Sequence, residues 1–579
     1  MSKIKCTIND TQIEVDKFTT ILEAAKSIGV NIPTLCHMKL DHLSVENKPS
    51  SCRLCVVEVE GRKNLVTACS EAVTDGMNIK TDTYRAVNAR RINLELLLSN
   101  HPKDCLICAK NLNCELQKLA GEMGVREIDY QGEAMKYEVD RSHAIRRDPS
   151  KCVMCRRCEM MCNKVQTVGV LSAINRGFGT TVMPAFNLNL MDSSCTFCGQ
   201  CVAVCPTGAI VETDETKKVW DAIRDPKKHV VVQVAPAIRV AIGEMFSMEP
   251  GTISTGKLVT ALRKLGFDAV FDTDFAADLT VMEEASELVH RIKTGGRLPM
   301  LTSCCPAWVR FIEENFHDML DVPSTCKSPQ IMMGAMIKTY YASKKQITPE
   351  DIVVVSIMPC TAKKEEIHRP ELRNNDFQDV DAVLSTRELG RMIQLFGIDY
   401  PNLEDSEFDN LMGVASGAGA IFGTTGGVIE ASVRTAYEMI THKSLEKIEF
   451  EELRGFENIR MATIDVDGMK LKIGIAHGLG SSRMLLEGLR NGEFDFDAIE
   501  IMACPGGCIG GGGQPYHQGN SSILQKRREA LYKEDAEKPI RKAHENPMIK
   551  RIYDEYLGEV YGQRAHELLH THYVERQKI

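Results

Sequence analysis

The chain has 579 residues, of which 43% are hydrophobic and 26% are charged. These fractions are usual for folded globular proteins and exclude a mostly disordered chain. Its 70 basic and 79 acidic residues give a formal net charge of −9, and the lack of a lysine- and arginine-rich block argues against nucleic-acid binding. Because the sequence has no long apolar run and no signal-peptide pattern, we expect no membrane span and a cytoplasmic location.

The 22 cysteines are distributed unevenly along the chain. Sixteen lie within the first 210 residues, and six lie in the remaining 369. In a large cytosolic chain, clustered C-x2-C spacings indicate metal sites rather than disulfides. The composition therefore separates a cysteine-rich arm from a larger domain of ordinary composition.

The first 80 residues predict a small strand-rich domain. Apolar and polar residues alternate at 4–8, residues 56–59 form a second short stretch, and residues 19–25 predict the start of a capped helix. Four cysteines of this domain have the spacing C-x15-C-x2-C-x13-C: Cys36, Cys52, Cys55 and Cys69. Plant-type [2Fe–2S] proteins have a shorter first gap, so the spacing favours a [2Fe–2S] cluster and leaves a zinc site as the alternative.

Residues 84–125 have a helical periodicity that contains a second group of ligands, and the polar residues 126–145 predict a connector. The group has the pattern H-x3-C-x2-C-x5-C and consists of His101, Cys105, Cys108 and Cys114. Three cysteines leave a cluster one ligand short, and the histidine stands at a suitable distance. We therefore expect a [4Fe–4S] cluster with His101 as its fourth ligand.

The run C-x2-C-x2-C-x3-C occurs twice, over 152–162 and over 195–205. This is the pattern of bacterial two-cluster ferredoxins, in which the fourth cysteine of each run binds the other cluster. Zinc is a poor alternative, because its sites need four ligands each and this spacing forms crossed triplets. One [4Fe–4S] cluster is predicted on Cys152, Cys155, Cys158 and Cys205. The other is predicted on Cys195, Cys198, Cys201 and Cys162.

Beyond residue 210 the pattern changes to strands alternating with helices. Apolar runs at 229–234 and 351–357 predict buried strands, and residues 256–265 and 279–293 predict helices. This order indicates an α/β domain with parallel pairing. The glycine-rich stretch 416–423 follows an acidic segment rather than a strand, which argues against a dinucleotide site.

Six cysteines remain in this larger domain, and the spacing alone predicts one further cluster held by four of them. They are Cys304, Cys305, Cys326, Cys360, Cys504 and Cys508. Their surroundings are distinctive: Thr-Ser-Cys-Cys-Pro-Ala-Trp at 302–308, Met-Pro-Cys-Thr-Ala-Lys-Lys at 358–364 and Glu-Ile-Met-Ala-Cys-Pro-Gly-Gly-Cys at 500–508. Together these segments resemble the three signatures of [FeFe]-hydrogenases, and the resemblance covers nearly the whole chain.

The resemblance implies a catalytic H-cluster, a [4Fe–4S] unit joined to a diiron subcluster that carries CO, cyanide and an azadithiolate. Its [4Fe–4S] half is expected on Cys305, Cys360, Cys504 and Cys508, with Cys508 bridging to the diiron unit. Lys363 is expected to donate a hydrogen bond to a cyanide, and Met358 and Met502 to pack against the diiron unit. Further residues are expected at the pocket wall: Ala235, Pro236, Gln330, Phe422 and Gly423. Family members have serine where this chain has Ala237, so one hydrogen bond to a cyanide is expected to be missing.

The resemblance also implies a route for protons. Cys304 would pass protons to the azadithiolate amine, and the outward relay would consist of Glu284, Ser324 and Glu287, with Arg291 near the exit. A thiol and carboxyl groups suit this task because they exchange protons near neutral pH. Without the resemblance, Glu284 and Glu287 at i, i+3 would be interpreted as an exposed helix face.

The sequence therefore predicts an α+β multidomain protein with five parts. They are a β-grasp, plant-ferredoxin-like [2Fe–2S] domain at 1–80, a small His/Cys3 [4Fe–4S] domain at 81–125, a bacterial-ferredoxin-like domain with two [4Fe–4S] clusters at 140–212, a large α/β H-cluster domain with parallel sheets at 213–535, and a helical small-subunit-like tail at 536–579.

The predicted reaction is the reversible conversion of two protons and two electrons to H2, with electrons passing through the four accessory clusters. The first 125 residues also resemble the iron–sulfur subunit of respiratory NADH dehydrogenase. A catalytic subunit of an NAD(P)- or ferredoxin-linked complex, in some cases electron-bifurcating, is therefore expected, with flavin- and NAD-binding partner subunits. A stand-alone ferredoxin hydrogenase is the alternative. A non-catalytic hydrogenase-like iron–sulfur protein is a remote one, because such proteins lack the complete second and third signatures.

Overall fold

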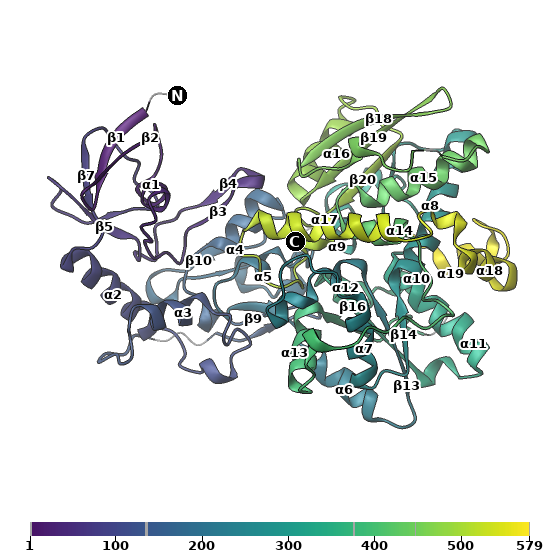
Figure 1. Ribbon diagram of the computed structural model, residues 1–579, viewed down its shortest axis with the longest axis horizontal. Helices are drawn as coiled ribbons and strands as arrows, with labels where there is room; N and C mark the ends of the chain where they lie inside the picture. Colours follow the sequence, from purple (N-terminus) through teal and green to yellow (C-terminus); the bar gives the residue numbers. More distant parts are fainter. Residues whose placement is uncertain (1–2, 134–136, 375–376, 446, 578–579) are drawn as a thin grey trace.

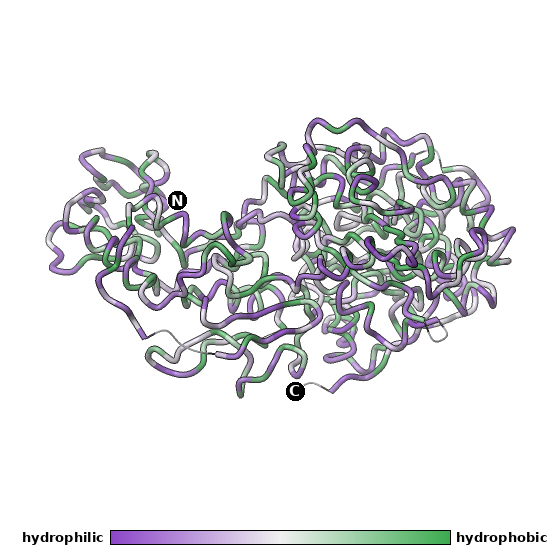
Figure 2. The backbone as a smooth tube through the Cα atoms, turned by 90° about the horizontal axis from the view of Figure 1, so that it is seen from below, coloured by the Kyte–Doolittle hydropathy of each residue, from purple (hydrophilic) through white to green (hydrophobic). Residues whose placement is uncertain are grey.

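The computed structural model describes residues 3–133, 137–374, 377–445 and 447–577. A narrow N-terminal arm joins a larger domain, so the molecule is elongated (Figure 1). Hydrophobic segments gather inside the larger domain, while its outer loops are mostly hydrophilic (Figure 2). Within the described residues, no helix is both long and apolar enough to cross a membrane. The predicted connector 126–145 includes 134–136, which lie outside the described residues.

The N-terminal sheet has the strand order β2-β1-β7-β5-β6, with β1 antiparallel to β2 and parallel to β7. Helix α1 begins after Thr20, whose side chain accepts from the Glu23 amide while the Glu23 carboxylate accepts from the Thr20 amide. This capping box fixes the start of the helix. The predicted β-grasp arrangement is confirmed by its elements: β1 (Lys3–Ile8), β2 (Thr11–Asp16), α1 (Ile21–Ser27), β5 (Val56–Val59), β6 (Val66–Thr67) and β7 (Met77–Lys80).

Two helices flank the second ligand group, α2 (Tyr84–Ser99) and α3 (Glu115–Glu122). The next part of the arm is built on a small antiparallel sheet of order β12-β9-β8 and two short helices that follow cysteines. Its elements are β8 (Asp140–Arg141), β9 (Ile145–Arg147), α4 (Arg157–Met160), α5 (Gln200–Val204) and β12 (Ile210–Glu212).

The larger domain contains two four-stranded sheets. One is fully parallel and has the order β14-β13-β16-β17. The other has the order β15-β20-β19-β18 and is parallel except for the β18–β19 pair. The strands are β13 (His229–Val234), β14 (Ala269–Asp272), β15 (Met300–Leu301), β16 (Ile352–Met358), β17 (Ala382–Ser385), β18 (Ile459–Val466), β19 (Met469–His477) and β20 (Ala498–Met502). The predicted α/β domain with parallel sheets is thus confirmed.

Helix α8 (Thr273–Thr294) is the longest of the larger domain and packs against α10 (Pro329–Met336) and α15 (Gly427–Thr441). It starts at residue 273 rather than at the predicted 279, because Asp272 caps it by accepting from the Asp274 amide. Most of α8 is buried, including several of its acidic residues.

The C-terminal segment wraps across the larger domain (Figure 1). Helix α17 (Ser521–Glu537) runs through the predicted boundary at 535/536. The buried Arg434 guanidinium donates to both oxygens of Asp535, at 2.9 Å each, and so ties α17 to α15. Two helices follow, α18 (Pro547–Ile552) and α19 (Gln563–Leu569), and they pack on the main core.

Candidate active site and cluster sites

Four parallel strands from the two sheets of the larger domain end at one cavity. Strands β13 and β16 of the first sheet are followed by Ala235 and Pro359, and strands β15 and β20 of the second sheet lead to Cys304 and Ala503. All four segments line the same cavity. Ligand sites of α/β proteins lie at the carboxyl ends of parallel strands, and here two sheets contribute to one site.

Five of the six cysteines of the larger domain meet in this cavity, Cys304, Cys305, Cys360, Cys504 and Cys508. The wall also contains many of the predicted pocket residues, and Ala237 is part of it. Those are Ala235, Pro236, Gln330, Met358, Lys363, Phe422 and Met502. Predicted Gly423 lies just behind the wall, since a Cβ added there would lie 3.4 Å from the Cβ of Ala237.

The cavity suits a bulky iron–sulfur cofactor. Thiolates are soft ligands that favour iron–sulfur clusters, and the five cysteines of this cavity include the four expected ligands of a cubane, Cys305, Cys360, Cys504 and Cys508. Gly507 adopts a φ of +96°, and a Cβ there would lie 2.6 Å from the Thr425 amide nitrogen. Only glycine fits this close approach. Gly507 lies in the loop that carries the last two cysteines, Cys504 and Cys508.

Lys363 is the cation of the cavity wall. Its ammonium donates to the Cys304 carbonyl oxygen at 3.1 Å and to Glu366 Oε2 at 2.9 Å. Burial alone would lower the pKa of Lys363, but the charge of Glu366 outweighs it and raises the pKa. Gln330 donates to the same Glu366 oxygen at 3.0 Å. Glu366 therefore keeps the ammonium charged and fixed beside the cysteines.

Cys304, which is partly buried, and Glu284, which is fully buried, influence each other electrostatically. Burial and the neighbouring Glu284 raise the pKa of the Cys304 thiol well above its ordinary value. Burial and the neighbouring Glu287 raise the pKa of Glu284 to about 8. Within the described parts of the chain, neither Glu284 oxygen has a hydrogen-bond partner of normal geometry. Both groups thus hold protons at neutral pH.

Glu287 continues from Glu284 along α8, and both carboxyls are buried, with 1% and 0% exposure. The interpretation as an exposed helix face is therefore wrong. The Ser324 hydroxyl donates to Glu287 Oε2 at 2.9 Å, and Arg291 Nη2 donates to Glu287 Oε1 at 2.6 Å. Arg291 is less buried than Glu287, and Glu284 is influenced by both Glu287 and Ser324, so the predicted relay residues lie near one another.

The two ferredoxin-like runs form two separate cavities with crossed cysteines. One cavity is lined by Cys152, Cys155, Cys158 and Cys205. The other is lined by Cys162, Cys195, Cys198 and Cys201. In each, the fourth cysteine comes from the other run, which is the arrangement that the spacing predicts.

The second of these cavities adjoins the large one through tightly packed backbone. Thr361 Oγ1 donates to the Phe197 carbonyl oxygen at 2.8 Å, and Gln200 Nε2 donates to the Gly510 carbonyl oxygen at 3.0 Å. A Cβ at Gly199 would lie 2.2 Å from Thr361 Oγ1. The loops that carry Cys198 and Cys360 are therefore in direct contact.

The cysteines of the N-terminal sheet are all buried, and the thiols of Cys36 and Cys52 contact each other, as do those of Cys55 and Cys69. Buried Asn47 links this group to the next one. Its side-chain amide donates to the carbonyl oxygens of Cys36, at 2.7 Å, and Cys155, at 2.9 Å.

The His101 group lies at the outer edge of the arm. Cys105 is exposed, and Cys108 and Cys114 are partly buried. Burial lowers the pKa of His101 to about 4, and its Nδ1 is buried without a hydrogen-bond partner in the described structure. A neutral imidazole with a free ring nitrogen is what a metal ligand requires, so this histidine fits the predicted fourth ligand.

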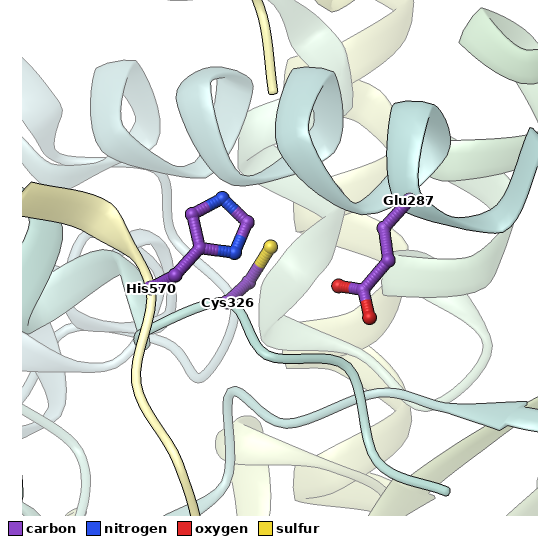
Figure 3. A group of neighbouring side chains, drawn as sticks. All are labelled: Glu287, Cys326 and His570. Atoms are coloured by element: carbon purple, nitrogen blue, oxygen red, sulfur yellow. The ribbon is translucent and has the colours of Figure 1, made fainter. Parts of the chain in front are cut away.

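Sequence reasoning missed several polar residues that organise these sites. Glu366 stands three residues after Lys363, a helical spacing that could have indicated the pair. Asn47 has no sequence signal of this kind. Thr325 and His570 were also missed: Thr325 Oγ1 donates to Glu287 Oε2 at 3.1 Å and lies 2.7 Å from His570 Nδ1. His570 and Cys326 face Glu287 (Figure 3).

Comparisons with protein families agree with this division of the chain. Residues 228–512 match the iron only hydrogenase large subunit, C-terminal domain, and residues 521–576 match the iron hydrogenase small subunit. In the arm, residues 1–84 match a 2Fe-2S iron-sulfur cluster binding domain, 90–129 match the NADH-ubiquinone oxidoreductase-G iron-sulfur binding region, and 190–211 match a 4Fe-4S binding domain.

The chain is 55% identical to the NADP-reducing hydrogenase subunit HndD of Solidesulfovibrio fructosivorans, with 100% of both chains covered. The chain belongs to the [FeFe]-hydrogenase family. It is also 39% identical to iron hydrogenase 1 of Clostridium pasteurianum, over 98% of this chain and 99% of that one. A solved apo [FeFe]-hydrogenase from Chlamydomonas reinhardtii is 43% identical, with a TM-score of 0.57, and covers 63% of this chain and 100% of its own.

As a member of this family the chain is a hydrogenase that carries iron–sulfur clusters. More distant relatives are named for a different role: cytosolic iron-sulfur assembly component 3 of Mus musculus is 30% identical over 71% of this chain and 88% of its own length.

The raised pKa of Glu284 predicts a pH-dependent stability. Between its ordinary pKa of 4.5 and about 8, the folded state holds this proton more tightly than the unfolded state does, so stability is lost as pH rises across that range. Glu284→Gln removes the effect. Relative to the parent hydrogenase, the variant should gain more thermal stability at pH 8 than at pH 5, measured by calorimetry.

Glu487→Gln, at an exposed position of helix α16 (Leu479–Arg490), is the matched control and should follow the parent curve. A Glu284→Gln curve that stays parallel to the parent curve would show that Glu284 is not held protonated.

Proposed function

We propose that this hydrogenase interconverts protons, electrons and H2 at an H-cluster in the strand-end cavity, as the catalytic subunit of an NAD(P)-linked complex. The observation that carries the proposal is the complete set of groups around one apolar cavity: four thiols, Lys363 and Cys304. The bound cluster would supply the electrons and the metal centre at which H2 forms. Cys305, Cys360, Cys504 and Cys508 would hold it, and the ammonium of Lys363 would donate to a cyanide.

The side chains of this chain move the protons. A neutral Cys304 thiol offers its proton to the cavity and takes another from Glu284. Glu284 is reloaded from Glu287 through the Ser324 hydroxyl, and Arg291, which is less buried, holds Glu287 in place. Because burial keeps Cys304 and Glu284 protonated, each transfer can start from a loaded donor.

Electrons reach the cavity through the accessory clusters. The Cys36 group and the His101 group each adjoin the Cys152 site. The first does so through Asn47, which donates to the Cys155 carbonyl oxygen. The second does so at Gly208, where an added Cβ would lie 2.5 Å from Cys108 Sγ. The two groups are two entry points that converge. From there the Cys195 site passes electrons across the contact of Phe197 with Thr361.

The identity to the NADP-reducing hydrogenase subunit and the NADH-ubiquinone oxidoreductase-G-like region support the complex. Flavin- and NAD(P)-binding partner subunits would dock near the [2Fe–2S] end. A stand-alone ferredoxin hydrogenase is the second candidate, favoured by the exposure of Cys105, which gives a small carrier access to a cluster. Co-purification from the native source separates the two.

The proposal predicts about 20 irons per matured chain, from one [2Fe–2S], three accessory [4Fe–4S] clusters and the H-cluster. Expression without the maturation enzymes should leave about 18, with no H2 evolution and no CO or cyanide infrared bands. Iron analysis, infrared spectroscopy and H2 production measure these quantities. Strong H2 evolution by the unmatured chain, or a matured chain without CO and cyanide bands, would contradict the proposed cofactor.

The second prediction concerns the acceptor. Because the sequence has no nicotinamide-binding fingerprint, the purified chain alone should reduce methyl viologen with H2 but not NAD(P)+. Adding the native partner subunits should restore NAD(P)+ reduction. Fast NAD(P)+ reduction by the single chain would refute the need for partners.

The third prediction concerns Cys304. Cys304→Ser should keep all iron and the infrared bands but lose most turnover, by about 10²-fold or more, because a hydroxyl is a far weaker proton donor than a thiol. Cys326→Ser is the matched control and should stay close to the parent rate. Near-full activity of Cys304→Ser at equal iron content would require another proton path.

A further inference from the structure

Three side chains of types that commonly bind metals meet beside the proposed proton relay (Figure 3). Glu287 comes from α8, Cys326 from the loop before α10, and His570 from the residue after α19. Their ligand atoms all lie within 4.8 Å of one another, and each residue is at most 8% exposed. Segments far apart in the sequence thus place a thiol, an imidazole and a carboxylate around one point.

This set suits a divalent ion of the zinc class, which binds Cys, His and carboxylate side chains in a tetrahedron. Zinc–ligand bonds of about 2.0–2.3 Å bring ligand atoms to roughly 3.3–3.8 Å from one another, so the three atoms need to approach one another by at most about 1.5 Å. Glu283 Oε2 lies 3.0 Å from His570 Nε2. Either this carboxylate or a water molecule can supply the fourth ligand.

The charges around the group favour a cation. Glu283, Glu284 and Glu287 all face Cys326, and burial together with these carboxylates raises the pKa of its thiol. Among the described residues, Arg291 is the cation that hydrogen-bonds to this set. An entering dication would displace the Cys326 proton and any proton on the His570 nitrogen that binds it. Metal–sulfur and metal–nitrogen bonds form, the displaced protons go to solvent, and no oxidation state changes.

A second cluster of ligand atoms in the described structure lacks these properties. Glu438, His544 and Glu545 are partly or fully exposed. The Lys542 ammonium already donates to Glu438, at 2.5 Å, and lies 3.2 Å from Glu545. Both groups therefore pair with a cation, and they differ in burial and in the thiol, which the second group lacks; the second group serves as an internal control.

We propose that Glu287, Cys326 and His570 bind one divalent transition-metal ion of the zinc class, and that the bound ion stops the proton relay. Glu287 accepts from Ser324 and Arg291, so it is the carboxylate that joins the inner and outer parts of the relay. A metal on this carboxylate removes the proton-accepting oxygen. The effect on turnover rests on the proposed relay, whereas the binding itself does not.

The experiment titrates Zn²⁺ into the matured hydrogenase under anaerobic conditions. Zinc content, iron content and the zinc X-ray absorption fine structure are measured beside H2 production. The parent should bind one zinc more than Cys326→Ala, with one sulfur at about 2.3 Å and nitrogen or oxygen ligands at about 2.0–2.1 Å. Iron content should stay constant, and turnover should fall at least about tenfold and recover with a chelator.

Cys326→Ala should keep the basal rate and lose the inhibition at the same zinc concentration. His570→Gln provides a second variant with the same expected loss, and His544→Gln at the control cluster should behave as the parent. Equal zinc content in the parent and Cys326→Ala, or several sulfur ligands accompanied by iron loss, would overturn the site. If one zinc binds and turnover is unchanged, the metal site is supported and the proposed proton relay through Glu287 is refuted.

Discussion

The meeting of strand ends from two different sheets is the constraint on which the catalytic cavity depends. Pro236 and Cys360 follow strands of the fully parallel sheet, whereas Cys305 and Cys504 follow strands of the mixed sheet. Neither sheet alone holds four thiols, so the ligand set forms only when both sheets have folded and packed. The wall between them is largely apolar, and in such surroundings the charge of Lys363 acts strongly on whatever is bound.

The same constraint organises the connection to the arm. The segments that follow β16 and β20 turn outward after their cysteines, and these turns are the surfaces on which the second ferredoxin-like loop packs. Glycines at Gly199 and Gly512 allow backbone to approach backbone, since a Cβ at Gly512 would lie 2.7 Å from Gly199 Cα. Short, rigid contact through backbone is what electron transfer between neighbouring clusters needs. The fold thus joins the cofactor ligands and the electron route in the same loops.

The sequence could predict the ligands better than their supports. Cysteine spacing is a local property, so the two crossed sets and the His101 group could be proposed from spacing, and the structure brings the members of each crossed set to one cavity. The start of α8 was predicted too late because Asp274 and Asp278 look like surface residues, although both are buried. Asn47 and Glu366 act through contacts with residues far away or with a buried ammonium, and Thr325 and His570 come together only through the folded tail. No periodicity or spacing encodes the contacts of Asn47, Thr325 and His570, whereas the i, i+3 spacing of Lys363 and Glu366 is a local signal.

The proposed proton and electron routes use different physical means in this molecule. The proposed electron route consists of backbone and cysteines in close contact, whereas the proposed proton route consists of side chains on α8 and on the loop 324–326. Glu284 is the extreme case: its buried carboxyl lacks a well-formed hydrogen bond in the described structure, which costs free energy. A fully bonded carboxyl would be more stable but would have to break those bonds at every transfer. The Glu284 carboxyl has no such bonds to break, and the stability that it costs is offset by the large apolar core around α8.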